Sequence, residues 1–302
     1  MNALSIVVQL AGGILLAPLL PGLIQHLKAR LQGRRGPTPL QPYRELRRLW
    51  RKSTVDIEGA GIVYRLAPSV TAASVALAVL LVPVAVGSPS LGVGRDVLAL
   101  LGVLALGRFA VAAASWDVAN GFALMGASRD LTIAIFTDVT FVLAAAAAAL
   151  VAHTTNLSAM IAGTAVWSNP ALGLAAVAFA VVVVAETGRQ PVDNPDTHLE
   201  LTMIHEGPLL EYAGRDLAFL QWSAAVRHWV VLVLAAQVFL PHATSVWGQL
   251  ATLPFALAAL CAGLALLETL TAKMRILLAP RLLAVGAAAA LLGIVSWLVQ
   301  VS

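Results

Sequence analysis

Acidic and histidine side chains gather in one polar stretch of the sequence, between Glu186 and Asp216. This stretch holds seven acidic residues, two arginines and two histidines. Carboxylates and imidazoles carry protons, pair with cations or hold metal ions. His198 and His205 lie seven residues apart, roughly on one helical face, but this spacing matches no common zinc motif. We therefore favour pairing with nearby acids, or a proton relay, over a metal site.

The same polar stretch contains a helix signal. Thr197 followed by Glu200 forms a capping box, which predicts the start of a helix. Gly207-Pro208 should interrupt this helix, because proline removes a backbone donor and glycine is a poor helix former.

A second set of charges lies within long apolar runs. Arg108 would lie in the middle of a helix, where a charge costs about 2.5–3.5 kcal/mol even on a lenient insertion scale, so it needs a partner. Asp117 would lie on the opposite side of the same helix, and we expect Asp138 of the next helix to be the partner. Such a pair suits either proton transfer or a static link between two helices. We expect Arg227 to reach the membrane surface and Glu268 to take an interfacial position.

These charges must be positioned by membrane helices. The chain is 60% hydrophobic and 11% charged over 302 residues, and about 20 apolar residues cross the hydrocarbon core of a bilayer. Eight segments qualify or nearly qualify, at residues 3–27, 62–87, 97–116, 130–152, 170–186, 218–240, 248–269 and 281–300. A further apolar segment, 159–166, is too short to cross. We expect an all-α polytopic protein whose residues 1–302 form a single integral membrane domain.

The distribution of cations predicts the orientation. The first loop, about 28–61, carries nine of the nineteen basic residues, and positive residues prefer the cytoplasmic side. The third, fifth and seventh loops also carry cations, whereas the second, fourth and sixth carry few. We therefore expect both termini outside a cell (inner) membrane, with loop one and loop five, about 186–217, facing the cytoplasm.

Loop one has a shape of its own. Three prolines within 33–42 exclude a regular helix there. Residues 43–52 would place Leu46, Leu49 and Trp50 on one face and arginines elsewhere, which predicts a short amphipathic helix at the membrane interface. An ordinary topogenic anchor is the alternative.

The sequence has a single cysteine, Cys261. One thiol cannot make a disulfide, a zinc site or an iron–sulfur cluster within the chain. We expect no cofactor to be bound by this chain alone, so a redox cofactor would belong to a partner. The formal charge of +4 reflects topology, and we expect no nucleic-acid partner.

Three motifs carry a resemblance to a known family: RRGPTPLQPYRE at 34–45, GASRD at 126–130 and ETGRQPVDNPDTHLELTMIHE at 186–206. Together they resemble the membrane subunit shared by respiratory complex I, where it is subunit 1, the quinone-tunnel subunit, and the group 4 membrane-bound [NiFe] hydrogenases. The hydrogenase branch, of the formate hydrogenlyase subunit 4 and hydrogenase-4 component C type, is the more similar. The likeness covers nearly the whole chain.

Some positions depart from the family pattern. Complex I subunits typically read E-T-N-R-x-P-F-D, whereas this chain has Gly188 and Val192 in place of the asparagine and the phenylalanine. The hydrogenase branch usually has glutamate after GASR and a Glu-Pro pair further along; here Asp130 and Asp138-Val139 stand there. The acid function is kept by shorter side chains, and the proline is lost.

The resemblance implies a docking platform for a peripheral redox arm and a route for ions. The implied partners are a hydrogenase-like large subunit, a small iron–sulfur subunit and antiporter-like membrane subunits, with the [NiFe] centre and iron–sulfur clusters in those partners and quinone as an optional ligand. The implied junction residues are Arg35, Gly36, Pro37, Gln41, Pro42, Glu186, Arg189, Asp193, Asp196, His198, Glu200, His205, Glu206 and Glu211. The implied intramembrane charged set is Arg108, Asp117, Arg129, Asp130 and Asp138.

Three functions stay open at this point. The first is a non-catalytic membrane subunit of a hydrogenase or formate hydrogenlyase complex, which couples electron transfer to movement of protons or sodium. The second is the quinone-site subunit of a complex I-type NADH dehydrogenase. The third is a stand-alone secondary transporter, although no internal repeat of the kind common in transporters is evident. In the first two cases the chain is part of an oxidoreductase complex without a redox centre of its own.

Overall fold

The computed structural model describes residues 7, 9–84, 96–163, 169–194, 203–241, 243 and 245–301. The described residues form helices and the loops between them, without a β-strand, and one isolated backbone bridge joins Asp96 to Asn156. Six helical stretches in it are long and apolar enough to cross a membrane. They are α4 (Ile62–Leu81), α5 (Val97–Val118), α6 (Gly121–Ala152), α9 (Gly214–Phe239), α10 (Val246–Leu270) and α11 (Ala279–Val301), the last preceded by the 3₁₀ turn η4 (Ile276–Leu278). The chain is therefore a multi-pass membrane protein.

The helices begin where short polar side chains cap their first turns. Asp96 accepts a hydrogen bond from the Leu98 backbone N–H at the start of α5. Asn120 caps α6 in the same way, as do Asn169 for α8 (Pro170–Glu186) and Ser245 for α10. Such side chains satisfy backbone donors that a helix start leaves free. Pro170 occupies the first turn of α8, where its missing N–H is not needed.

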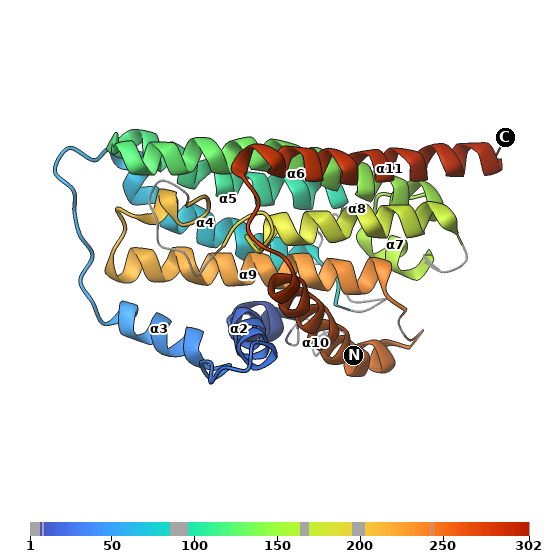
Figure 1. Ribbon diagram of the computed structural model, residues 1–302, viewed down its shortest axis with the longest axis horizontal. Helices are drawn as coiled ribbons and strands as arrows, with labels where there is room; N and C mark the ends of the chain where they lie inside the picture. Colours follow the sequence, from blue (N-terminus) through green and yellow to red (C-terminus); the bar gives the residue numbers. More distant parts are fainter. Residues whose placement is uncertain are drawn as a thin grey trace.

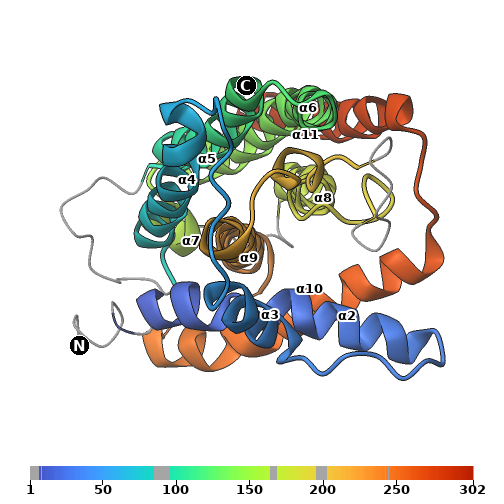
Figure 2. The same cartoon turned by 90° about the vertical axis from the view of Figure 1, so that its left-hand side faces the viewer.

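The long helices form a bundle with α8 and α9 near its middle. Figure 1 shows α6, α9 and α11 running along the long axis of the molecule. The end-on view of Figure 2 shows α4, α5, α6 and α11 around one side of α8 and α9, while α2 (Leu19–Leu31), α3 (Gln41–Trp50) and α10 lie across the other side. α8 packs on α6, α9 and α11, and α10 packs on α2.

Small residues allow this close packing. Ala144, Ala145, Ala147 and Ala148 in the alanine run of α6 are all buried, so this run serves close helix packing. Where α11 crosses α8, a Cβ on Gly293 would lie 2.9 Å from the carbonyl oxygen of Ala171. The two backbones are therefore in direct contact at a position that only glycine fits.

The structure corrects two of the predicted boundaries. α6 begins at Gly121 rather than near residue 130, because Asn120 caps it and GFALMGASRD continues as regular helix. Asp130 therefore lies in the third turn of α6 and not at its start. In loop five, residues 203–206 are not helical and Gly207–Leu209 form one 3₁₀ turn, η3, so the predicted helix is wrong there; the capping box at Thr197 and Glu200 lies outside the described residues.

The first predicted span is irregular. It contains a stretch of π-helix, η1 (Ala11–Leu16), and then α2, which begins after Pro18. The Trp222 indole N–H donates to the carbonyl oxygen of Ile14 at 3.0 Å, and the Tyr43 hydroxyl donates to that of Leu15 at 2.6 Å. These two side chains bind carbonyl groups at the π-helical stretch, and such stretches are frequent at functional sites.

Most other predicted elements agree with the structure, although α4 ends at Leu81, well before the predicted residue 87, and residues 82–84 are not helical. α8 has its predicted bounds, and the short segment near 159–166 is α7 (Leu157–Gly163). The amphipathic helix is α3: its Leu49 is buried, and the edge of Trp50 packs on Phe219 of α9. The eight-span count and the orientation of the termini stay predictions, since six long helices are shown.

Candidate functional site

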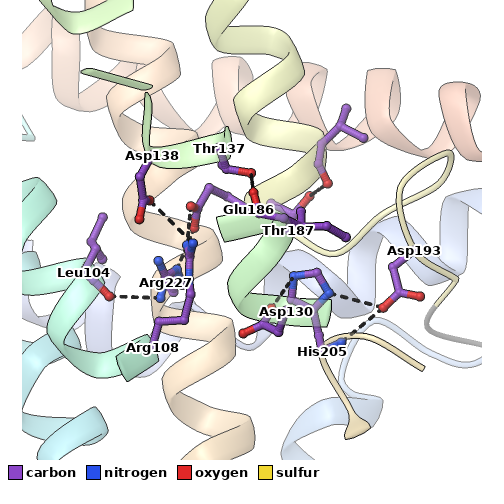
Figure 3. A network of polar contacts seen from close by, with 12 residues as sticks. Leu104, Arg108, Asp130, Thr137, Asp138, Glu186, Thr187, Asp193, His205 and Arg227 are labelled. Carbon is purple, nitrogen blue, oxygen red and sulfur yellow. Dashed lines mark hydrogen bonds and ion pairs between the residues drawn. The ribbon is translucent and has the colours of Figure 1, made fainter. Parts of the chain in front are cut away.

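A buried carboxylate at the end of α8 lies between two arginines (Figure 3). The side chain of Glu186 is 1% exposed. One of its oxygens accepts from the Arg108 guanidinium of α5, and the other accepts from Arg227 Nε of α9 at 2.6 Å. Arg227 also donates to the carbonyl oxygen of Leu104 at 3.1 Å. Three helices are thus joined by two ion pairs that share one carboxylate.

The predicted pair of Arg108 and Asp138 is present, but it is the weaker one. Its two atoms lie 3.5 Å apart, and the Asp138 side chain is 38% exposed. The expectation that Arg227 extends to the membrane surface is wrong, because Glu186 holds it inside the bundle. The length of α8 indicates that Glu186 lies within the bilayer. Its 17 residues make only about 26 Å, shorter than the roughly 30 Å hydrocarbon core, so the helix does not reach both surfaces.

A second cluster ties loop five to the connection between α10 and α11. Asp193 accepts from Lys273 Nζ at 2.9 Å and lies 3.2 Å from His205 Nδ1. The other ring nitrogen of His205 lies 3.7 Å from an Asp130 carboxylate oxygen on α6. Asp130 in turn is close enough to Arg108 for their charges to interact. Charges of alternating sign therefore run from Lys273 to the Glu186 group.

The geometry shifts the protonation of this cluster. Burial alone would raise the pKa of Asp193, but the hydrogen bonds and charges of His205 and Lys273 outweigh it and hold the pKa well below its ordinary range. Burial alone would lower the pKa of His205, but the hydrogen bond to Asp193 and the charges of Asp130 and Asp193 outweigh it, so this pKa is raised. The cluster thus favours a charged imidazolium beside a charged carboxylate.

A third buried carboxylate is Glu268 at the end of α10. It accepts from Arg189 Nη1 at 3.1 Å and pairs with Lys28 Nζ at 3.3 Å, and its side chain is 0% exposed. Protein therefore encloses Glu268 two residues before the end of α10, and its interfacial position stays a prediction. The turn of loop five around Arg189 places its guanidinium over the end of α10, while Met274 N–H donates to the Pro191 carbonyl oxygen at 2.9 Å. α2, loop five and α10 are joined at this point.

A partly open cavity of about 660 Å³ lies beside these clusters. Its walls come from α2, α3, α4, α5, α6, α8, α9 and the described part of loop five. The charged groups on its wall include Arg108, Asp130, Glu186, Asp193, His205 and Arg227. Although His205 is packed within the fold, 34% of its side chain is exposed, since it faces this space. The cavity therefore gives water or a ligand access to the ion-pair network.

Three buried nitrogen atoms at the cavity lack a partner within the described residues: the donors Arg189 Nε and Arg227 Nη2, and His228 Nε2, which donates in one of the two imidazole tautomers. Buried donors are normally satisfied by protein or by ordered water. Water molecules or a ligand with acceptor oxygens would fit this wall. The donors meet one requirement for a quinone headgroup, whose carbonyl oxygens accept hydrogen bonds, and the remaining wall is largely apolar.

The other predicted residues divide by location. Gln41, Pro42, Arg189 and Glu206 line the cavity with the residues above, and Arg129 donates to the Met203 carbonyl oxygen of loop five at 3.4 Å. Asp117 and Glu211 lie elsewhere: Asp117 accepts from the Tyr64 backbone N–H at 2.9 Å, at the start of α4. Arg35, Gly36 and Pro37 are outside the cavity, on the loop between α2 and α3. Asp196, His198 and Glu200 lie outside the described residues.

Sequence reasoning missed the roles of four residues. The sequence places Arg227 at the membrane surface, Glu268 at the interface, and Lys28 and Lys273 among the loop cations, yet each belongs to an ion pair of the network. His228 was not singled out, because one histidine in an apolar run gives no periodic signal. The one signal for these roles is the number of acidic residues, because each acid that is buried needs a cationic partner.

Fold and site together define a multi-pass helical membrane protein with an ion-pair network beside a partly open cavity. A family model described as NADH dehydrogenase matches residues 4–298, and the chain belongs to this family, that of complex I subunit 1. The predicted family is confirmed.

Relatives from the hydrogenase branch share more identity with the chain than a complex I relative does. Formate hydrogenlyase subunit 4 of Escherichia coli K12 is 34% identical over 300 residues, which cover 93% of this chain and 94% of the relative. Hydrogenase-4 component C of the same organism is 33% identical, with 76% and 72% covered. An NADH-quinone oxidoreductase subunit of Geobacillus kaustophilus is 28% identical, with 76% and 72% covered.

A solved structure confirms the fold. A chain of the membrane-bound sulfane sulfur reductase, an archaeal respiratory membrane complex, superposes with a TM-score of 0.81. The comparison covers 97% of this chain and 99% of that chain at 21% identity. The relatives and this neighbour are subunits of respiratory membrane complexes.

Proposed function

We propose that the chain is the non-catalytic membrane subunit of a respiratory-type hydrogenase or formate hydrogenlyase complex in the cell (inner) membrane. In this role it docks a peripheral [NiFe] and iron–sulfur arm at its cytoplasmic side. It couples electron transfer in that arm to the movement of protons or sodium. The similarity to two hydrogenase-branch relatives supports the branch.

One observation carries the coupling part of this proposal. The charges of Lys273, Asp193, His205 and Asp130 form a continuous series that reaches Arg108 and Glu186 inside the bundle. A change of charge at loop five therefore alters the field at a buried carboxylate, because low-dielectric surroundings screen charges weakly. A redox step in an arm that contacts loop five would act on the network in this way.

The docking part rests on the acidic residues of loop five. Glu206 lies at the cavity wall next to His205, and Glu200 precedes it in the sequence. Charge reversal at both positions should release the peripheral arm or uncouple it. Unchanged association together with unchanged turnover would contradict docking at loop five.

Identifying the partners is the direct test of the proposed function. A tagged chain purified in mild detergent should bring with it a hydrogenase-like large subunit, a small iron–sulfur subunit and antiporter-like membrane subunits. Recovery of the chain alone, with transport activity in liposomes, would instead support a stand-alone transporter.

The ion-coupling step has a separate test. Asp138→Asn should lower ion movement per electron. The complex should still assemble, because the pair with Arg108 is long, at 3.5 Å, and the Asp138 side chain is 38% exposed. If assembly collapses in this variant and in Arg108→Gln alike, the pair is a static link between helices.

The cavity supports a second candidate, the quinone-site subunit of a complex I-type dehydrogenase. A volume of about 660 Å³ holds a drug-sized ligand. Arg189 Nε, Arg227 Nη2 and His228 Nε2, which have no partner among the described residues, could bind the carbonyl oxygens of a quinone. Co-purification of a flavin-containing, NADH-oxidising arm with quinone-dependent turnover would favour this candidate over the first.

A further inference from the structure

The exposed face of α3 carries a concentrated positive charge that the ion-pair network does not use. Residues Arg44, Arg47, Arg48 and Trp50 of α3 are exposed or partly exposed, and so are Arg51 and Lys52 after it. Glu45 is the only carboxylate between residues 44 and 52, and it pairs with Arg48. In the described part of the chain, Arg44, Arg47 and Arg51 have no carboxylate partner.

The face of α3 turned toward the bundle holds Leu49, which is buried. Trp50 has both environments: its ring meets Phe219 with ring centroids 5.1 Å apart, while the residue remains 50% exposed. Tyr43 donates to the Leu15 carbonyl oxygen, which fixes the other end of the helix. These contacts set the rotation of α3, so its arginines have to point away from the bundle.

The position of α3 corresponds to the headgroup region of a bilayer. Phe219 lies five residues beyond Gly214, where α9 begins, so Trp50 packs about 7.5 Å from that end of the span. Each headgroup region is about 5–7 Å thick. A Cβ on Gly214 would meet the Ser53 carbonyl oxygen at 2.2 Å, which places the segment after α3 at the very end of α9.

Apolar side chains at the two ends of α3 are exposed as well. Leu40, directly before the helix, is 55% exposed, and Trp50, its last residue, is 50% exposed. A surface that combines exposed indole and leucine side chains with arginines matches the boundary between headgroups and acyl chains. An acidic protein surface would neutralise the arginines but would leave no apolar phase for these two side chains.

We propose that α3 and the two residues after it bind the headgroups of anionic phospholipids. The guanidinium groups of Arg44, Arg47 and Arg51 pair with headgroup phosphates, and Trp50 lies at the level of the glycerol backbone. The site holds the end of α9 and the first helices in contact with the cytoplasmic leaflet. It does not depend on what docks at loop five.

Binding of short-chain phosphatidylglycerol and phosphatidylcholine to the purified full-length chain tests this site, with native mass spectrometry as the readout. Wild type should prefer phosphatidylglycerol. The double variant Arg47→Gln, Arg51→Gln should lose roughly tenfold in affinity for phosphatidylglycerol, since each cation near an anionic surface contributes substantially, and should bind phosphatidylcholine unchanged. Arg47→Lys with Arg51→Lys should keep the preference, because the charge is kept.

A matched control removes two cations elsewhere. Arg275→Gln with Arg281→Gln changes the net charge equally, but these residues are not on an amphipathic helix, so the preference should remain. An equal loss in this control, or no preference in wild type, would overturn the proposal. If the α3 variant instead binds lipid normally but loses co-purifying proteins, α3 contacts an acidic protein and not lipid.

Discussion

At the scale of single residues, the stability of the network depends on how many cations pair with each carboxylate. Glu186 pairs with two arginines and Asp193 pairs with a lysine and a histidine, whereas Asp138 pairs with one distant arginine. Removing one member of a buried ion pair is costly because an uncompensated charge remains. The effect of a substitution should therefore follow burial and partner number.

Glu186→Gln should destabilise the chain by about 3–5 kcal/mol, because it leaves Arg108 and Arg227 without their shared partner. Asp138→Asn should cost less than about 1 kcal/mol, since its pair is long and its side chain more exposed. The free energy of unfolding in mixed micelles measures both. Equal losses would mean that Asp138 matters as much as Glu186 to the folded state.

Asp193 and His205 should make stability depend on pH in opposite directions. The raised pKa of His205 contributes stability that is complete below about pH 6.5 and is lost as pH rises through the folded-state value. The lowered pKa of Asp193 contributes stability that is present above about pH 3.9 and is lost as pH falls through its folded-state value. Both contributions are present between these two limits.

His205→Asn should therefore flatten the fall in thermal midpoint that wild type shows between about pH 6.5 and 9. His153→Asn serves as the control, because His153 lies at the far end of α6 in a left-handed conformation that asparagine tolerates. Midpoints measured across this range for the three proteins check the prediction. An unchanged slope in His205→Asn would show that another group titrates.

At the scale of elements, loop five is held by a backbone contact with α6. A Cβ on Gly126 would lie 2.7 Å from the Gly207 Cα, so η3 lies directly on the first turns of α6. This contact brings His205 next to Asp130. The motif GASRD thus matters for its glycine as well as for its charges.

Gly126→Ala should displace η3 and destabilise the chain by about 1–3 kcal/mol, as overpacking does. Gly102→Ala in α5 should be neutral or slightly stabilising, because nothing lies within 4 Å of its Cβ position and alanine is the better helix former. The reaction of buried Cys261 with a thiol dye during heating reports both transitions. A lower midpoint for Gly102→Ala than for Gly126→Ala would contradict the assigned contact.

The sequence predicts the bounds of the helices better than it predicts which side chains form ion pairs. The apolar runs define α5, α8, α10 and α11 within a few residues, because this signal is local. The partners of Arg227 and Glu268 are set by how helices far apart in the sequence cross, which no local pattern records. The early start of α6 was missed because Arg129 and Asp130 looked like a helix end, although their charges are compensated from loop five and α5.

At the scale of the whole molecule, three buried clusters join helices that do not follow one another in the chain. Glu186 connects α5, α8 and α9; Asp193 connects loop five to the segment between α10 and α11; Glu268 connects α2 to α10. All three border or adjoin the same cavity. Rearrangement of one cluster would therefore change the shape of the space that the other two share.

The unequal lengths of α6 and α8 have a consequence for the surrounding bilayer. α6 has 32 residues and α8 has 17, so the two packed neighbours differ by about 22 Å in length. α8 is largely enclosed by protein, and the hydrophobic mismatch falls on α6, which has to tilt or distort the lipid around it. A change in the acyl-chain length of the lipids should therefore change the depth of Glu186 in the bilayer, without any change in the sequence of the protein.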